Sequence, residues 1–194
     1  MKSIPDVTVP EGTKGAWCVE RFEVSKRDAD FENMRSIFGG GRYIRPGIYT
    51  RLTRHGHVVM SDTPAEKSDH LSPVLRASNH CLVNGLGLGM VVNAMLLKPE
   101  VTKVTVVERS EDVIALVAPH YLSQYGDRVN IVLADAFAYK PTGQYDVVWH
   151  DIWDNICSDN LEQMTKLKRK YGRRAQWQGC WCEYETRRYA RAGR

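Results

Sequence analysis

The chain has 194 residues, of which 43% are hydrophobic and 26% are charged. These values are typical of one folded domain with a small appendage, and they exclude a wholly disordered chain. Its apolar runs are shorter than the roughly 18 residues of a membrane span, and the first residues lack the apolar stretch of a secretory signal.

The net charge of +4 is unevenly distributed along the chain. Residues 166–194 contain ten Lys/Arg and two acidic residues, whereas the remainder contains 17 Lys/Arg and 21 Asp/Glu. The basic end admits two interpretations: a surface for nucleic acid or another anionic partner, or a solvated helix face followed by a frayed terminus. We favour the second interpretation.

Cysteine usage bears on the compartment and on metal binding. The five cysteines are irregularly spaced, which argues against a disulfide framework and favours the reducing cytoplasm. Cys157, Cys180 and Cys182 offer three thiols, but a one-residue spacing suits zinc poorly. We therefore predict no metal site.

Residues 1–79 are predicted to form a β-rich appendage with short helices. His55-Gly56 between two β-branched runs indicates a hairpin. A triple glycine follows a predicted helix and is a helix stop or flexible loop rather than a phosphate clamp. The predicted strands are 16–24, 47–53 and 57–60, the helix is 28–38, the glycines are 39–41, and 65–77 hold helical turns interrupted near Pro73.

Residues 80–194 alternate regularly between apolar strands and amphipathic helices. This pattern predicts an α/β domain with a mostly parallel sheet covered by helices on both faces. The predicted strands are 80–84, 103–108, 128–135, 145–151 and 176–185, and the predicted helices are 90–98, 110–126 and 158–172.

Glycines and acids gather at the predicted carboxyl ends of these strands, where an open parallel sheet binds its ligands. Gly85, Gly87 and Gly89 follow the first strand, and the missing Cβ atoms permit a tight turn and close approach of a ligand. Glu108 ends the second strand, where its carboxylate can accept from both hydroxyls of a ribose. Asp135 ends the third strand, where it can accept from an adenine amino group. The sequence therefore predicts an adenosine site.

Four segments carry a resemblance to a known family: NGLGLGM, VVERSEDVI, LADAFAY and YDVVWHDIWD. Together they resemble the S-adenosylmethionine-dependent methyltransferase fold, most closely its spermidine-synthase-like branch, over about residues 56–155. The resemblance implies a Rossmann-like domain over 80–194. It would be shortened at its C-terminal end, where the family adds two strands, and preceded by a small N-terminal β-hairpin segment.

The resemblance also implies roles for individual residues. The three glycines would pass the methionine part of the cofactor, Glu108 would hold the ribose, and Asp135 with Ala136 would hold the adenine. In polyamine synthases the position of Asp151 is the acid that helps to deprotonate the attacking amine, and Asp154 matches a second acid that binds the diamine.

Several positions depart from the polyamine-synthase pattern. Leu88 stands where those enzymes carry an aspartate in the glycine loop, and Met60 aligns with their glutamine on the N-terminal hairpin. Asn155 replaces a proline, and no tyrosine lies between Asp62 and Pro73. These departures weaken the expectation of a diamine pocket and leave the nucleoside half intact.

The aromatic and histidine neighbours of Asp151 divide between core and site. His150 and Asp151 are adjacent on a strand and point to opposite faces, so we expect His150 to be packed away. Trp149 is expected in the core. Trp153, in the following loop, could stack on a planar acceptor or on adenine, and we assign it with Asp154 to the substrate side.

The predicted function is S-adenosylmethionine-dependent methyl transfer to an unidentified small molecule. The alternatives are an aminopropyltransferase of the spermidine-synthase type and a non-catalytic nucleoside-binding protein that uses its basic end to hold nucleic acid. A homo-oligomer that covers an open sheet edge is also compatible with the sequence.

Overall fold

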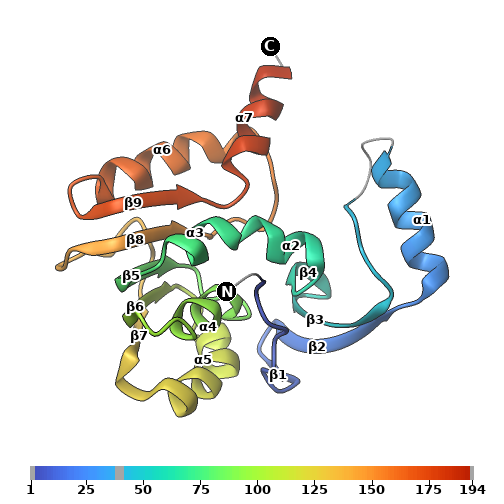
Figure 1. The fold of residues 1–194 in the computed structure, drawn as a ribbon, viewed down its shortest axis with the longest axis horizontal. Coiled ribbons are helices and arrows are strands. Elements are labelled where there is room, and N and C mark those ends of the chain that lie inside the picture. Colours follow the sequence, from blue (N-terminus) through green and yellow to red (C-terminus); the bar gives the residue numbers. More distant parts are fainter. Residues whose placement is uncertain (1–2, 38–41, 193–194) are drawn as a thin grey trace.

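A computed structural model describes residues 3–37 and 42–192 of the chain. It contains a four-stranded antiparallel sheet, followed in sequence by a five-stranded parallel sheet with helices on both faces (Figure 1). The predicted fold class is confirmed, although the N-terminal segment is a full sheet rather than a small hairpin. No helix within the described ranges is long and apolar enough to cross a membrane.

The N-terminal sheet has the order β1-β2-β3-β4. The predicted hairpin is confirmed between β3 and β4, where His55 and Gly56 both have positive φ, as a tight two-residue turn requires. The sequence missed β1, which is too short to show an alternating pattern. The elements are β1 (Gly12–Lys14), β2 (Trp17–Val24), α1 (Lys26–Ile37), β3 (Gly47–Arg54) and β4 (His57–Ser61). The predicted triple glycine at 39–41 lies outside the described residues.

Two short helices, α2 (Pro64–Asp69) and α3 (Leu71–Arg76), connect the sheets. The prediction of an interruption near Pro73 was wrong in its position, because the break lies at His70. Pro73 occupies the first turn of α3, where the amide hydrogen that proline lacks would have no helical partner.

The second sheet has the order β7-β6-β5-β8-β9, and all neighbouring strands are parallel. The chain builds outward from β5 to β7 and then returns to the other side of β5. This reversal defines a switch point at the carboxyl ends of β5 and β8, where such sheets bind ligands. The strands are β5 (Asn79–Asn84), β6 (Val101–Glu108), β7 (Val129–Leu133), β8 (Tyr145–His150) and β9 (Ala175–Cys180).

Helices cover the two faces of this sheet because alternate strand residues point in opposite directions. Cys81 and Val83 of β5 pack in the cluster that includes residues of α3, α4 and α5, whereas Leu82 packs in the cluster under α6. The first cluster also includes Val19 and Leu52 of the N-terminal sheet, so the two sheets share one core. The helices are α4 (Met90–Leu96), α5 (Glu111–Tyr125), a 3₁₀ turn (Gly126–Arg128), α6 (Asn160–Tyr171) and α7 (Glu183–Ala192).

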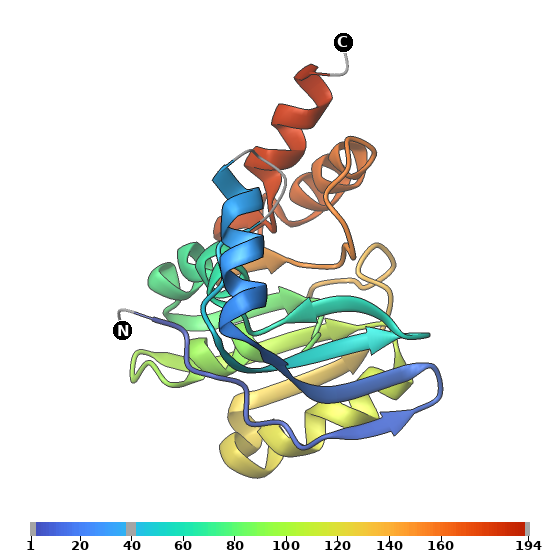
Figure 2. The same ribbon diagram turned by 90° about the vertical axis from the view of Figure 1, so that its right-hand side faces the viewer.

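The predicted strand over 176–185 was wrong beyond residue 180. Cys182 adopts a left-handed conformation that ends the extended chain, and α7 begins at Glu183. An ion pair of 2.7 Å between Glu183 and Arg187, one helical turn apart, favours the helix. This helix extends away from the sheets in both views (Figures 1 and 2).

Candidate functional site

One pocket of about 220 Å³ opens at the carboxyl edge of the parallel sheet, at the switch point between β5 and β8. Side chains of the N-terminal sheet and of α2 form its other wall. It is lined by Trp17, Leu52, Val59, Met60, Glu66, His70, Gly85, Gly87, Val107, Glu108, Arg109, Val113, Ala134, Asp135, Ala136, Phe137, Asp151, Ile152, Trp153, Asp154, Gln163 and Trp181. The structure thus brings together all the predicted site residues except Gly89.

The three glycines of the loop all have positive φ, but each one packs against a different part of the protein. A Cβ on Gly85 would lie 1.9 Å from the carbonyl oxygen of Asp151, and one on Gly87 would lie 2.2 Å from the sulfur of Met60. A Cβ on Gly89 would collide with the ring of Tyr121. Gly85 and Gly87, which line the pocket, therefore let the loop pack against the backbone of Asp151 and against Met60, whereas Gly89 lets the loop pack on α5.

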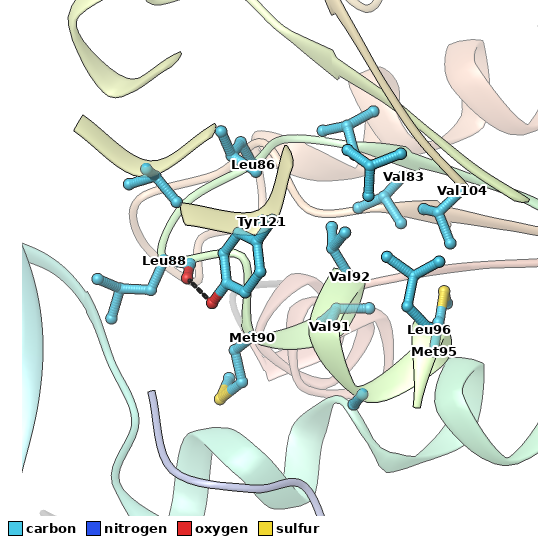
Figure 3. Close-up of a cluster of buried hydrophobic side chains, with 14 of the residues drawn as sticks. Val83, Leu86, Leu88, Met90, Val91, Val92, Met95, Leu96, Val104 and Tyr121 are labelled. Atoms are coloured by element: carbon cyan, nitrogen blue, oxygen red, sulfur yellow. Dashed lines mark hydrogen bonds between the residues drawn. The ribbon is translucent and has the colours of Figure 1, made fainter. Parts of the chain in front are cut away.

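Apolar side chains between the glycines fix the loop to the core. Leu86, Leu88 and Met90 are all at most 4% exposed, and Tyr121 donates a hydrogen bond of 2.8 Å to the carbonyl of Leu88 (Figure 3). Leu88 stands where polyamine synthases carry an aspartate. An ionised carboxylate in this fully buried position would lose its hydration, which explains the apolar residue physically.

Glu108 joins the glycine loop to the start of α5. It is 9% exposed, and its two carboxylate oxygens accept from the backbone N–H groups of Leu86 and Ser110, both at 2.8 Å. Each oxygen retains a further lone-pair direction for a ligand hydroxyl. Glu108 is thus fixed at the pocket wall by the backbone on either side of it.

Asp135 caps the turn that follows β7, because its Oδ1 accepts from the N–H of Phe137 at 2.6 Å. Lys170 of α6 supports the same turn and donates to the carbonyls of Ala136 and Phe137 at 3.0 and 2.7 Å. The sequence gave no indication of this role, since Lys170 belongs to the basic run and only the tertiary fold brings α6 against the turn.

Asp151 lies directly after β8, beside the glycine loop, and its backbone N–H donates to the carbonyl of Asn84 at 2.8 Å. Its side chain is 18% exposed, and Oδ2 lies 3.6 Å from Nε2 of His70. Desolvation, together with the negative charges of Glu66, Asp69 and Glu108, raises the pKa of Asp151 to about 8.

Glu66 and His70 are pocket residues that sequence reasoning missed. Burial raises the pKa of Glu66 to about 7 and lowers the pKa of His70 to about 3. Glu66 accepts from the N–H of Ser61 at 2.7 Å, and His70 packs edge-on against Trp149. Their spacing of four residues, which places two side chains on one side of a helix, was the only available signal.

The predicted second acid, Asp154, is paired with an arginine. Nη2 of Arg54 donates to Oδ2 of Asp154 at 2.5 Å, and the same guanidinium lies over the ring of Trp17. The pair joins residues 100 positions apart, of which Asp154 lines the pocket. The carboxylate that would bind one end of a diamine already has a cationic partner.

Trp153 lines the pocket and is 9% exposed, with its indole N–H donating to Gln163 at 2.9 Å. His150 and Trp149 are buried in the core, as predicted. His150 is held between Asn84 and Gln178, at 2.8 and 3.2 Å.

Comparison with known proteins gives structural neighbours but no family. No model of a known protein family matches the sequence, and no curated protein matches it. Solved structures that resemble the chain include several methyltransferases, as the sequence resemblance implied, but they do not single out the spermidine-synthase-like branch.

Three of these structures illustrate the range of identity, TM-score and coverage. A candidate RNA methyltransferase from Pyrococcus horikoshii is 13% identical, with a TM-score of 0.48 over 64% of this chain and 62% of that one. The CcbJ methyltransferase from Streptomyces caelestis is 20% identical, with a TM-score of 0.43 over 56% and 45%. The [4+2]-cyclase SpnF is 18% identical, with a TM-score of 0.39 over 46% and 36%. The chain spans less than two thirds of the length of each.

Proposed function

We propose that this protein is an S-adenosylmethionine-dependent methyltransferase that acts on an unidentified small molecule. The observation that carries the proposal is the convergence of the glycine loop, Glu108 and Asp135 on one pocket at the switch point of the sheet. These groups come from three successive strands, and each can hold a different part of an adenosine-containing ligand.

The residues fit the cofactor group by group. Glu108 is oriented to accept from ribose hydroxyls, and the Oδ2 of Asp135 is left to accept from an adenine amino group beside Ala136. Gly85 and Gly87 line the pocket and would pass the methionine portion. The carboxyl groups around the pocket also favour a positively charged ligand.

The cofactor supplies a methyl group that is already activated by the sulfonium charge. The protein then has to hold an acceptor in line, exclude water and receive a proton. Asp151 lies beside the glycine loop and is our candidate for proton acceptor. Trp153, which lines the same pocket, is our candidate for acceptor contact.

The ion pair between Arg54 and Asp154 weighs against aminopropyl transfer to a diamine. A diamine would have to displace the guanidinium from its partner and from the ring of Trp17. The methyltransferase proposal requires no such rearrangement.

Calorimetry with S-adenosylmethionine and S-adenosylhomocysteine tests the cofactor. We expect both compounds to bind with no added metal, and the absence of binding of either at millimolar concentration would refute the proposal. Incubation of the protein with S-adenosylmethionine and mixed candidate acceptors, read by mass spectrometry, then distinguishes methyl transfer, aminopropyl transfer and binding without turnover.

A further inference from the structure

The carboxyl groups around the pocket differ in how well their charge is compensated. Glu108 accepts two backbone hydrogen bonds, and Glu66 accepts one. Asp69, close behind Glu66, forms an ion pair of 2.5 Å with Arg42. Asp151 makes no side-chain hydrogen bond within the described ranges, and its Oδ2 lies 3.6 Å from Nε2 of His70.

His70 compensates Asp151 only weakly. Its side chain is 1% exposed, and its Nδ1 has no hydrogen-bond partner among residues 3–37 and 42–192. An imidazolium here would carry two N–H groups, one of them unsatisfied in an apolar environment, so the neutral ring is favoured. The guanidinium of Arg42 also disfavours a positive charge on the ring.

Two acids and a histidine from separate parts of the chain therefore line one pocket without a full complement of positive charge. Glu66 and His70 come from the connection between the sheets, and Asp151 comes from the end of β8. Buried polar groups in native proteins are normally paired. A shortage of positive charge in a pocket is relieved either by protons or by a cationic ligand.

We propose that Glu66, His70 and Asp151 form a proton-exchanging cation subsite, in which the empty pocket holds a proton on Asp151 and a positively charged organic group displaces it. The ligand class is a sulfonium, for which a simple alkylammonium serves as a probe. Naming the sulfonium rests on the proposed function, whereas the proton on Asp151 and its displacement by a simple ammonium do not.

The exchange balances in charge. The protonated carboxyl releases its proton to solvent, and the resulting carboxylate faces the incoming cation. Asp151 is thereby left in the basic form that can later receive a proton from an acceptor. A neutral ligand of similar shape offers no charge to replace the proton, so it should bind without releasing one.

The first experiment observes Asp151 directly in the ligand-free protein. Carbon-13 labelling of aspartate, with Asp151→Asn to assign the resonance, should show a carboxyl that titrates well above the usual range. Glu66→Gln retains an acceptor for the N–H of Ser61 but removes a negative charge, so it should lower the pH midpoint of the Asp151 titration. Glu111→Gln, an exposed position at the start of α5, is the matched control and should leave it unchanged.

Adding propylammonium chloride in the same experiment should move the midpoint downward, whereas sodium chloride at equal ionic strength should move it less. A midpoint in the ordinary aspartate range, or equal shifts with both salts, would overturn the proposal. This part does not depend on cofactor binding.

The second experiment counts protons by calorimetry at neutral pH in two buffers of different ionisation enthalpy. We expect about one proton to be released with S-adenosylmethionine and almost none with S-adenosylhomocysteine, since both carry the same amino and carboxyl groups and only the former carries a charge on sulfur. Asp151→Asn should abolish the difference. Equal release with both ligands, or release that persists in the variant, contradicts the subsite. If neither ligand binds, the proposed function fails and the carboxyl titration alone decides the inference.

Discussion

Replacing Glu108 tests the cofactor site and the structure of the glycine loop together. The carboxylate accepts two backbone hydrogen bonds at 2.8 Å, and each bond to a charged group contributes about 1.5–3 kcal/mol. Taking the lower value for each, because water can enter the open pocket, Glu108→Ala should lose about 3 kcal/mol of stability. For a chain of this size the melting temperature should fall by about 6–12 °C.

Glu108→Gln separates binding from folding. The amide retains one acceptor oxygen, so the variant should lose about half as much stability as the alanine variant. It removes the charged acceptor for two ribose hydroxyls, and affinity for S-adenosylmethionine should fall by about 10- to 150-fold. Thermal unfolding and calorimetry on the same samples measure both effects.

The matched control is Glu111→Gln, which changes an exposed carboxylate three residues away and should alter neither quantity. A folded Glu108→Gln protein that binds the cofactor as tightly as the parent would show that the ribose lies elsewhere. A stable Glu108→Ala protein would show that the loop does not depend on this carboxylate.

Four further outcomes are expected. Gly56 has positive φ but open space around it, so Gly56→Ala should cost about 1–2 kcal/mol of stability. Gly87 also has positive φ, and an added Cβ would collide with Met60, so Gly87→Ala should lower the melting temperature more. Equal losses would contradict the close packing of the loop. Lys170→Met should weaken cofactor binding several-fold in calorimetry while leaving far-ultraviolet circular dichroism intact, and unchanged affinity would show that the turn after β7 needs no support from α6. The pKa of Asp151 is raised from 3.8 to about 8, so at this carboxyl the folded protein binds more protons than the unfolded chain. Its contribution to stability is therefore present at acid pH and is lost as pH rises to about 8. The melting temperature of Asp151→Asn should accordingly rise relative to that of the parent over this range, and a constant difference would refute the shift. Deletion of residues 187–194 should leave cofactor affinity unchanged, and filter binding at low and physiological salt should show only weak binding of nucleic acid by the full chain; tight, salt-sensitive binding by the full chain alone would make nucleic acid the substrate.

The parallel domain could be predicted from the sequence because its signals are local. Apolar runs such as HCLVN and KVTVVE alternate with helical periods, and Ser110 caps α5 as its position suggests. Acids at strand ends share a sheet edge whatever the details of packing. The convergence of Glu108, Asp135 and Asp151 on one pocket therefore followed from strand order alone.

The opposite wall of the pocket could not be predicted in the same way. Glu66 and His70 lie in a connecting segment whose sequence shows only a helix start and a proline. Their approach to Asp151 depends on how α3 packs on α4, β8 and β9. The ion pair between Arg54 and Asp154 likewise joins distant parts of the chain, and no local pattern specifies it.

The predicted strand over 176–185 is a second place where a local sequence pattern did not give the structure. Alternating apolar residues continue past Cys180, which favoured an extended strand through residue 185. The backbone instead turns at Cys182, and Thr186 is buried and donates its hydroxyl to the carbonyl of Cys182. A single left-handed residue, which alternation cannot reveal, converted the predicted strand end into a helix.

Two departures from the polyamine-synthase pattern now have identified neighbours. Leu88 anchors the glycine loop in the core and Met60 packs against Gly87, while Arg54 forms an ion pair with Asp154. Met60 and Arg54 belong to the N-terminal sheet, whose side chains form part of the pocket wall. Because function depends on the site and not on the fold, acceptor choice in our proposal is determined by this sheet and α2. Exchanging Trp17 should therefore change which acceptors react before it changes cofactor affinity.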